Sequence, residues 1–130
     1  MKGVDTTFLI DLLRKSPSAV AKAVELDAEP IVFTTEANVY EIVSGIRNTN
    51  TEKALQDLES LLSRMVVLPL DRKASIYAGL ISSELMLKGK MIDDIDCLVA
   101  GILLTNGCET VVTRNVKHFE RIDGLKVESY

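Results

Sequence analysis

The sequence contains no tryptophan, and aromatic residues make up only 5% of its 130 residues. A folded core must therefore be built from aliphatic side chains. With 47% hydrophobic residues, the chain is too apolar for an intrinsically disordered protein. Its length suits one compact core, and no repeat or Gly/Ser/Pro-rich linker divides it. We therefore expect residues 1–130 to form a single domain.

Cysteine and long apolar runs are also scarce. The two cysteines, Cys97 and Cys108, lack the spacing of a disulfide scaffold or a metal-binding motif. The N-terminus lacks the apolar run of about 7–15 residues that a signal peptide needs. The longest apolar stretches, 66–70 and 98–104, fall short of the roughly 20 residues that cross a membrane. These absences predict a cytoplasmic protein with no membrane partner.

Basic residues do not outnumber acidic ones. The 15 Lys and Arg residues stand against 19 Asp and Glu residues, which gives a formal net charge of −4. A protein that holds nucleic acid through a broad basic surface has the opposite balance. Composition therefore argues against extensive electrostatic binding of RNA or DNA outside a local site.

Short β-branched segments alternate with longer amphipathic segments along the chain. The pattern predicts strands at 3–5, 31–34, 66–70, 110–113 and 126–128. It predicts helices at 6–13, 18–26, 36–47, 51–65, 72–87 and 94–106, with a helical turn at 116–122. The expected N-caps include Thr6 or Thr7, Thr35 and Asp71. Strands separated by helices predict a three-layer α/β/α fold with a central parallel sheet.

Two polar residues follow predicted strands. Asp5 ends the first strand, and Asn115 comes just after the strand at 110–113. Ligands bind at the carboxyl ends of the strands in parallel sheets, so both side chains are candidates for one cleft. The alternatives are a helix-capping role for Asp5 and a turn role for Asn115.

Two further carboxylates lie on predicted helices. Glu41 has small or polar neighbours one turn away and no cation to pair with, although it can also be an ordinary exposed residue. Asp96 heads an apolar helix face that should turn toward the core, where an unpartnered carboxylate is costly. A favourable interaction with the helix dipole is the alternative for Asp96, and it is our main assignment for Asp93 and Asp94.

Converging carboxylates repel one another unless something neutralises them. A hard divalent cation with oxygen ligands, Mg²⁺ or Mn²⁺, is the simplest neutraliser. Zinc is disfavoured because His118 is the only histidine and the cysteines are placed for packing. The pattern therefore predicts a magnesium or manganese site.

Four motifs, in this order and spacing, resemble the PIN domain, and most closely the VapC-type ribonuclease toxins of type II toxin–antitoxin pairs. The motifs are Asp5-Thr6-Thr7, Glu41 with Gly45, the segment 96–101 (DCLVAG) and the segment 113–119 (TRNVKHF). The likeness covers essentially the whole chain. One departure is Gly101, where the family often has alanine, and we expect this difference to be harmless.

The resemblance implies a single PIN domain with Mg²⁺-dependent (or Mn²⁺-dependent) endoribonuclease activity. Asp5, Glu41 and Asp96 stand where the family keeps its acidic metal-site triad, and Asn115 stands where some members carry a fourth acid and others an asparagine. Asp5 and Asp96 would hold the metal. Glu41 would orient or deprotonate the attacking water, or help to hold a second metal.

The resemblance also implies supporting residues and partners. The hydroxyls of Thr6 and Thr113 would orient carboxylates or scissile oxygens beside Asn115, and Arg114 and Lys117 are candidates for flanking phosphates. The expected partners are an RNA substrate, a second copy of the chain in a homodimer, and a cognate antitoxin protein.

Other functions remain open at the level of the sequence. A PIN-like fold can serve as a non-catalytic RNA- or protein-binding module with the same acids. A phosphatase or phosphoacceptor domain would favour a second acid directly beside Asp5 or a lysine at a strand end, and the chain has neither arrangement. A dinucleotide enzyme is disfavoured because no Gly-rich phosphate-binding motif is present.

Overall fold

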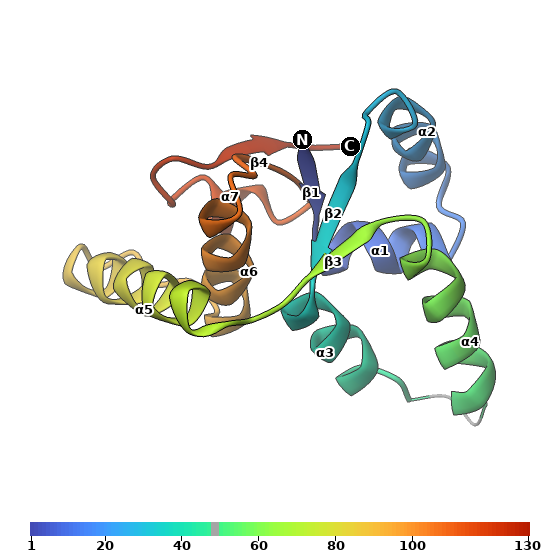
Figure 1. Ribbon diagram of the computed structural model, residues 1–130, viewed down its shortest axis with the longest axis horizontal. Helices are drawn as coiled ribbons and strands as arrows, with labels where there is room; N and C mark the ends of the chain where they lie inside the picture. Colours follow the sequence, from blue (N-terminus) through green and yellow to red (C-terminus); the bar gives the residue numbers. More distant parts are fainter. Residues whose placement is uncertain (48–49) are drawn as a thin grey trace.

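The computed structural model describes residues 1–47 and 50–130. Within these residues, five strands form one sheet in the order β3-β2-β1-β4-β5, and every neighbouring pair is parallel (Figure 1). The strands are β1 (Lys2–Val4), β2 (Val32–Thr35), β3 (Val66–Leu68), β4 (Thr110–Val112) and β5 (Lys126–Glu128). The predicted parallel sheet is confirmed.

Helices cover both faces of this sheet. They are α1 (Thr6–Leu13), α2 (Pro17–Leu26), α3 (Glu36–Ser44), α4 (Thr51–Leu62), α5 (Arg72–Leu87), α6 (Asp94–Thr105) and α7 (Val116–Phe119). One hydrophobic cluster packs α1, α2 and α4 on one face, and a second packs α5, α6 and α7 on the other (Figure 1). Helix α3 contributes Ala37 to the second cluster and Ile42 to the first. The predicted three-layer α/β/α architecture is therefore confirmed.

The helix ends follow local capping chemistry. The side chains of Thr35 and Asp71 cap α3 and α5 as expected, by accepting the backbone N–H three residues ahead. The expectation that Thr6 or Thr7 caps the first helix is wrong, because Asp5 occupies the N-cap position and accepts the N–H of Phe8. The two threonines already lie inside the first turn of α1.

Helices α3 and α4 are each three residues shorter than predicted, ending at Ser44 and Leu62. Gly45 follows α3 directly, and glycine is a poor helix former. No described helix is both long and apolar enough to cross a membrane.

The strand order places β4 beside β1, although the two strands are far apart in the sequence. The chain runs outward from β1 through β2 to β3, and then returns to add β4 and β5 on the other side of β1. Such a reversal is where α/β sheets open a crevice for ligands at the carboxyl ends of the strands. Val4 pairs with Val112 in the β1–β4 register, so Asp5 and Thr113 both emerge at this point.

Candidate active site

Asp5 lies at the centre of this crevice, with only 2% of its surface exposed. Its Oδ1 accepts hydrogen bonds from the Thr7 hydroxyl at 2.7 Å and the Phe8 N–H at 3.2 Å. Its Oδ2 accepts a hydrogen bond from the Thr113 hydroxyl at 2.6 Å. Asp5 therefore caps α1 and also lies in the crevice. The hydrogen bonds at the start of α1, together with that from Thr113, hold its carboxylate in one orientation.

The two hydroxyls on Asp5 are themselves held by backbone groups. Thr113 accepts the N–H of Asn115 at 2.8 Å, and Thr7 accepts the N–H of Arg114 at 3.0 Å. Thr6, which we expected to orient a carboxylate, instead accepts a hydrogen bond from the Asn38 side chain at 3.1 Å. Its neighbour Thr7 therefore takes the place in the site that the sequence suggested for Thr6.

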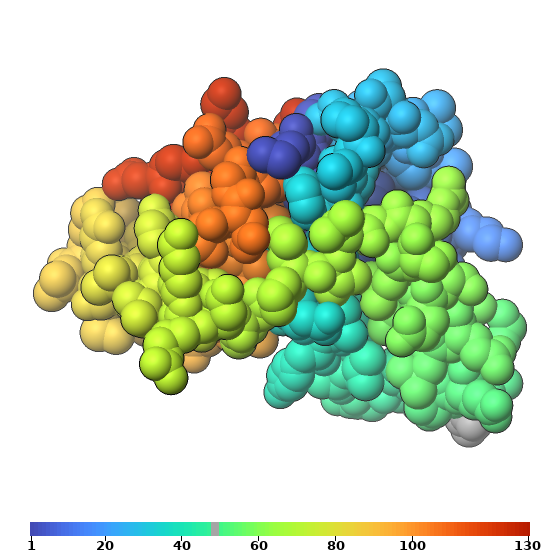
Figure 2. Space-filling model, in the orientation of Figure 1, coloured from blue at the N-terminus to red at the C-terminus, as the bar shows by residue number. Residues whose placement is uncertain are grey.

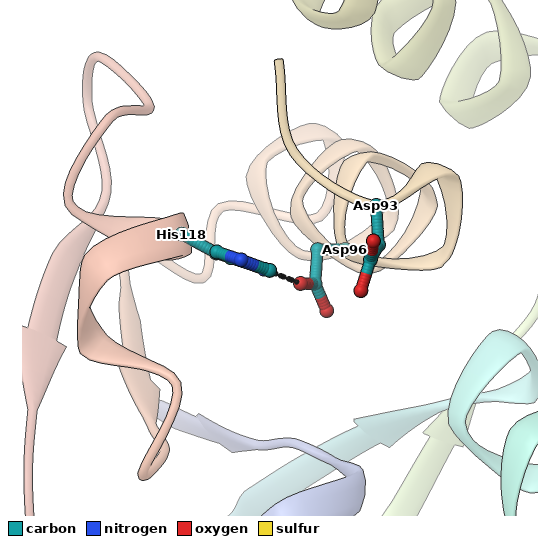
Figure 3. A group of neighbouring side chains, drawn as sticks. All are labelled: Asp93, Asp96 and His118. Carbon is teal, nitrogen blue, oxygen red and sulfur yellow. Dashed lines mark hydrogen bonds and ion pairs between the residues drawn. The ribbon is translucent and has the colours of Figure 1, made fainter. Parts of the chain in front are cut away.

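Asp96 lies in the first turn of α6 and is buried, as its apolar helix face predicted. Its Oδ2 accepts a hydrogen bond from the Asn115 amide at 2.9 Å and lies 2.7 Å from Nδ1 of His118. Asp93 occupies the N-cap position of α6, but its side chain makes no capping hydrogen bond. It lies beside Asp96 instead, so that donor atoms of Asp93, Asp96 and His118 all fall within 4.8 Å of one another (Figure 3).

Glu41 reaches the site from α3, and buried Asn38 fixes that helix one turn earlier. The Asn38 side chain accepts a hydrogen bond from Thr35 at 2.8 Å and donates one to Thr6, which ties α3 to β2 and α1. The negative charge of Glu41 raises the pKa of Asp96, so the two carboxylates are close enough to repel. Glu41 itself is half-buried, and its carboxylate has no hydrogen-bonding partner within residues 1–47 and 50–130.

The charged forms of Asp5 and Asp96 are disfavoured by their surroundings. Burial raises the pKa of Asp5 to about 6, against the lowering effect of its hydrogen bonds, and the charge of Asp96 adds to the rise. Burial also raises the pKa of Asp96, in opposition to the hydrogen bond from His118. No lysine or arginine in the described part of the chain forms an ion pair with Asp5, Glu41 or Asp96. Arg114, which the sequence suggested as a phosphate-binding residue, pairs with Asp11 at 2.8 Å.

This donor set fits a hard divalent cation. Carboxylate oxygens are preferred protein ligands of Mg²⁺ and Mn²⁺, and a bound cation would offset the burial that mainly raises both aspartate pKa values as well as the smaller repulsion between the carboxylates. Asp5 and Glu41 each interact electrostatically with Asp96, but the group of acids and histidine in the described residues whose donor atoms lie within 4.8 Å of one another is Asp93, Asp96 and His118. The expectation that Asp5, Glu41 and Asp96 share one cation therefore stays a prediction.

Three residues of the site were missed in the sequence. Thr7 was overlooked because the residue at which α1 begins decides which of the two adjacent threonines faces Asp5, and the sequence does not fix that residue. His118 was considered only as evidence against zinc, although its place three residues after Asn115 on a predicted helical turn puts both on one face. Asn38 could have been recognised only as a polar residue on the inner side of an amphipathic helix, a pattern that does not identify its hydrogen-bonding partners.

Comparison with known proteins agrees with this geometry. The PIN domain profile matches residues 3–125. A tRNA(fMet)-specific endonuclease VapC of Salmonella typhimurium is 28% identical over 98% of this chain and 96% of its own length. Ribonuclease VapC1 of Methanocaldococcus jannaschii is 30% identical over 95% of this chain and 84% of its own length.

Among solved structures, VapBC2 of Rickettsia felis bound to a promoter DNA fragment superposes with a TM-score of 0.88. The match has 25% identity and covers 99% of this chain and 98% of that one. The fold, the order of the motifs and the full-length similarity therefore agree, and the chain belongs to the PIN domain family as a VapC-type member.

Proposed function

We propose that this protein is an endoribonuclease that hydrolyses RNA phosphodiester bonds with Mg²⁺ or Mn²⁺. The observation that supports the proposal is that Asp96 interacts electrostatically with both Asp5 and Glu41, while none of the three has a lysine or arginine ion-pair partner in the described residues. The full-length similarity to VapC ribonucleases supports RNA as the substrate. We further propose that residues 1–130 work as one PIN domain, in the cytoplasm.

In this proposal, each acid has its own role. Asp5 and Asp96 are the metal ligands, because they are buried and held by hydrogen bonds in fixed orientations. A bound divalent cation would lower the pKa of a water molecule and screen the charge that builds up on the phosphate. Glu41 has a free carboxylate, so it orients the attacking water and accepts its proton, or contributes to a second cation site.

The polar neighbours keep these acids in place. Thr7 and Thr113 hold Asp5, while Asn115 holds Asp96, so that little reorganisation is needed when substrate binds. Lys117 is exposed on α7 and has no ion pair among the described residues, which makes it the better candidate for a flanking phosphate. Arg114 would first have to leave Asp11.

An antitoxin is the proposed protein partner. The Rickettsia felis neighbour is a two-component VapBC2 complex. In this chain, α1, α2 and α4 enclose an apolar groove, whose lining includes Leu12, Val20, Ala23, Leu61 and Met65. An apolar segment of the antitoxin would fill this groove. The protein would then act as the toxin of the pair.

A homodimer is the second proposed assembly. Helix α5 exposes Ile76, Leu80 and Leu87 along one face, with 59%, 65% and 86% of their surfaces accessible. The helix lies at the outer end of the molecule, where part of its surface faces solvent (lime to yellow in Figure 2). Apolar surface concentrated in this way marks an interface, and a second copy of the same helix is the simplest complement.

A cleavage assay tests the catalytic proposal against its alternative, a non-catalytic binding module. The purified chain is incubated with a mixture of structured RNAs in Mg²⁺, in Mn²⁺ and in excess EDTA. Cleavage in either metal and none in EDTA is the expected result. RNA binding without cleavage in any metal would contradict the catalytic proposal and favour the binding module.

A further inference from the structure

His118 is the only histidine in the chain, and it lies inside the crevice. We propose that His118 is a positioning residue, whose Nδ1–H works with the Asn115 amide to occupy Oδ2 of Asp96, so that Oδ1 is the oxygen left for the metal. This role rests on the proposed metal-dependent function and adds to it a residue that acts on the metal only through Asp96.

The three polar groups form a closed triangle. Nδ1 of His118 lies 2.7 Å from Oδ2 of Asp96, and the Asn115 amide nitrogen lies 2.9 Å from each of them. The aspartate side chain is 10% exposed and the imidazole 30% exposed, so water competes little for these contacts. Figure 3 shows the ring directed at one oxygen of Asp96 while the other oxygen points away from it.

The contact with Asp96 assigns the ring hydrogen to Nδ1, and the Asn115 amide, which donates to the same carboxylate, then makes no hydrogen bond with Nδ1. An ionised carboxylate only accepts hydrogen bonds, so the short contact to Asp96 requires Nδ1–H on His118. Terminal carboxylate torsions are broad and nearly two-fold, and a single donor would leave Asp96 free to rotate. Two donors on the same oxygen hold the group with Oδ2 toward α7 and Oδ1 directed away from the imidazole (Figure 3).

The turn that carries His118 is anchored at both ends. The Asn115 N–H bonds to Thr113, which itself bonds to Asp5, and Phe119 is fully buried in the core. The imidazole therefore has a fixed base from which to orient Asp96. Asp93 has no comparable support, since it is exposed and its side chain makes no capping bond.

Metal affinity measures this role without relying on cleavage. Binding of Mn²⁺ is followed by the loss of the free-ion EPR signal in tag-free wild type, His118→Ala and His118→Asn. Asparagine places an amide N–H where the imidazole Nδ1–H stood, so it restores the donor. Glu120→Ala, an exposed change at the end of the same turn, is the matched control.

We expect His118→Ala to bind Mn²⁺ about 10–100-fold more weakly, as is usual when a group that orients a metal ligand is removed. His118→Asn should recover most of the affinity, and Glu120→Ala should match wild type. All four proteins should melt at similar temperatures without metal. Because the chain has one histidine, ¹⁵N-histidine NMR of the metal-free wild type should show a single ring with hydrogen on Nδ1.

The outcomes separate this role from the proposed function. If wild type binds Mn²⁺ and His118→Ala binds it equally well, His118 does not position Asp96. Equal losses in His118→Ala and His118→Asn, or a ring with hydrogen only on Nε2, would also overturn the role. If wild type binds no Mn²⁺ at all, the metal-dependent function itself fails, and the role of His118 fails with it.

Discussion

The hydroxyl of Thr113 donates a 2.6 Å hydrogen bond to Oδ2 of Asp5, which joins the carboxyl ends of β4 and β1. Both side chains are almost completely buried, and hydrogen bonds to a carboxylate in such surroundings are short and strong. The same contact closes the crevice where the strand order reverses. The site is therefore part of the sheet's own topology and does not depend on a flexible loop.

Replacing Thr113 tests this contact. Thr113→Val keeps the shape of the side chain and removes the donor, so Asp5 loses one of its three hydrogen bonds. We expect RNA cleavage to fall about 10–100-fold, with a loss of about 1–3 kcal/mol in the free energy of unfolding. Thr113→Ser, which retains the hydroxyl, should stay close to wild type in cleavage. Equal cleavage by the valine and serine variants would show that the contact does not serve the site.

The raised pKa of Asp5 predicts an unusual pH dependence for the metal-free protein. Between the ordinary value of 3.8 and about 6, the native state binds the Asp5 proton more tightly than the unfolded state does. Protonated Asp5 therefore contributes to the free energy of unfolding at low pH, and this contribution is lost as the pH rises through the folded pKa. For a shift of about two units, the loss is up to about 3 kcal/mol.

Urea unfolding at pH values from 4 to 7 measures this effect. The free energy of unfolding of wild type should fall relative to that of Asp5→Asn as pH rises, and Asp27→Asn at an exposed position should follow wild type. Saturating Mn²⁺ at pH 7 should stabilise wild type but not Asp5→Asn. Parallel curves for wild type and Asp5→Asn would contradict the raised pKa.

Gly101 lies where the packing of α6 against α5 leaves no room for a side chain. An added Cβ would lie 2.7 Å from Cβ of Ala78 and 2.8 Å from the backbone oxygen of Ala74, so α5 would have to move away from α6. Alanine gains about 1 kcal/mol in helix propensity, but overpacking costs about 1–3 kcal/mol. We expect a net loss of stability for Gly101→Ala in urea unfolding. A more stable variant would show that the two helices adjust freely.

The exposed apolar face of α5 predicts that the protein forms a homodimer through this helix. Leu80→Asp places a charge in the middle of the exposed apolar face, and it should convert a dimer into a monomer in light scattering without lowering the melting temperature of the monomer. Gln56→Asp on α4 adds the same side chain at an exposed position away from α5 and serves as the control. A dimer that survives Leu80→Asp would place the interface elsewhere.

Much of the fold follows from local sequence patterns. Asp5 and Asn115 are recognisable because each comes after a β-branched segment, and Asp96 because it heads an apolar helix face. The strand order is not readable in the same way, since pairing in a parallel sheet depends on long-range packing. The adjacency of Asp5 and Thr113, which are separated by 108 residues in the chain, becomes visible only in the folded sheet.

The errors in the site share a physical cause. Thr6 and Thr7 have the same chemistry, and only the point at which α1 begins decides which hydroxyl meets Asp5. His118 contacts Asp96 because Phe119 anchors the α7 turn in the core, which a single sequence does not reveal. Residue types were therefore readable from the sequence, whereas the direction of each side chain required the packed structure.

The most direct test of the central claim compares RNA cleavage by wild type, Asp5→Asn and Asp96→Asn in Mg²⁺ and Mn²⁺, beside thermal melts without metal. We predict that both variants lose cleavage, while Asp96→Asn melts at the same or a higher temperature because a buried charge, and with it the smaller repulsion from Glu41, is removed. Cleavage at the wild-type rate by both variants would contradict the account.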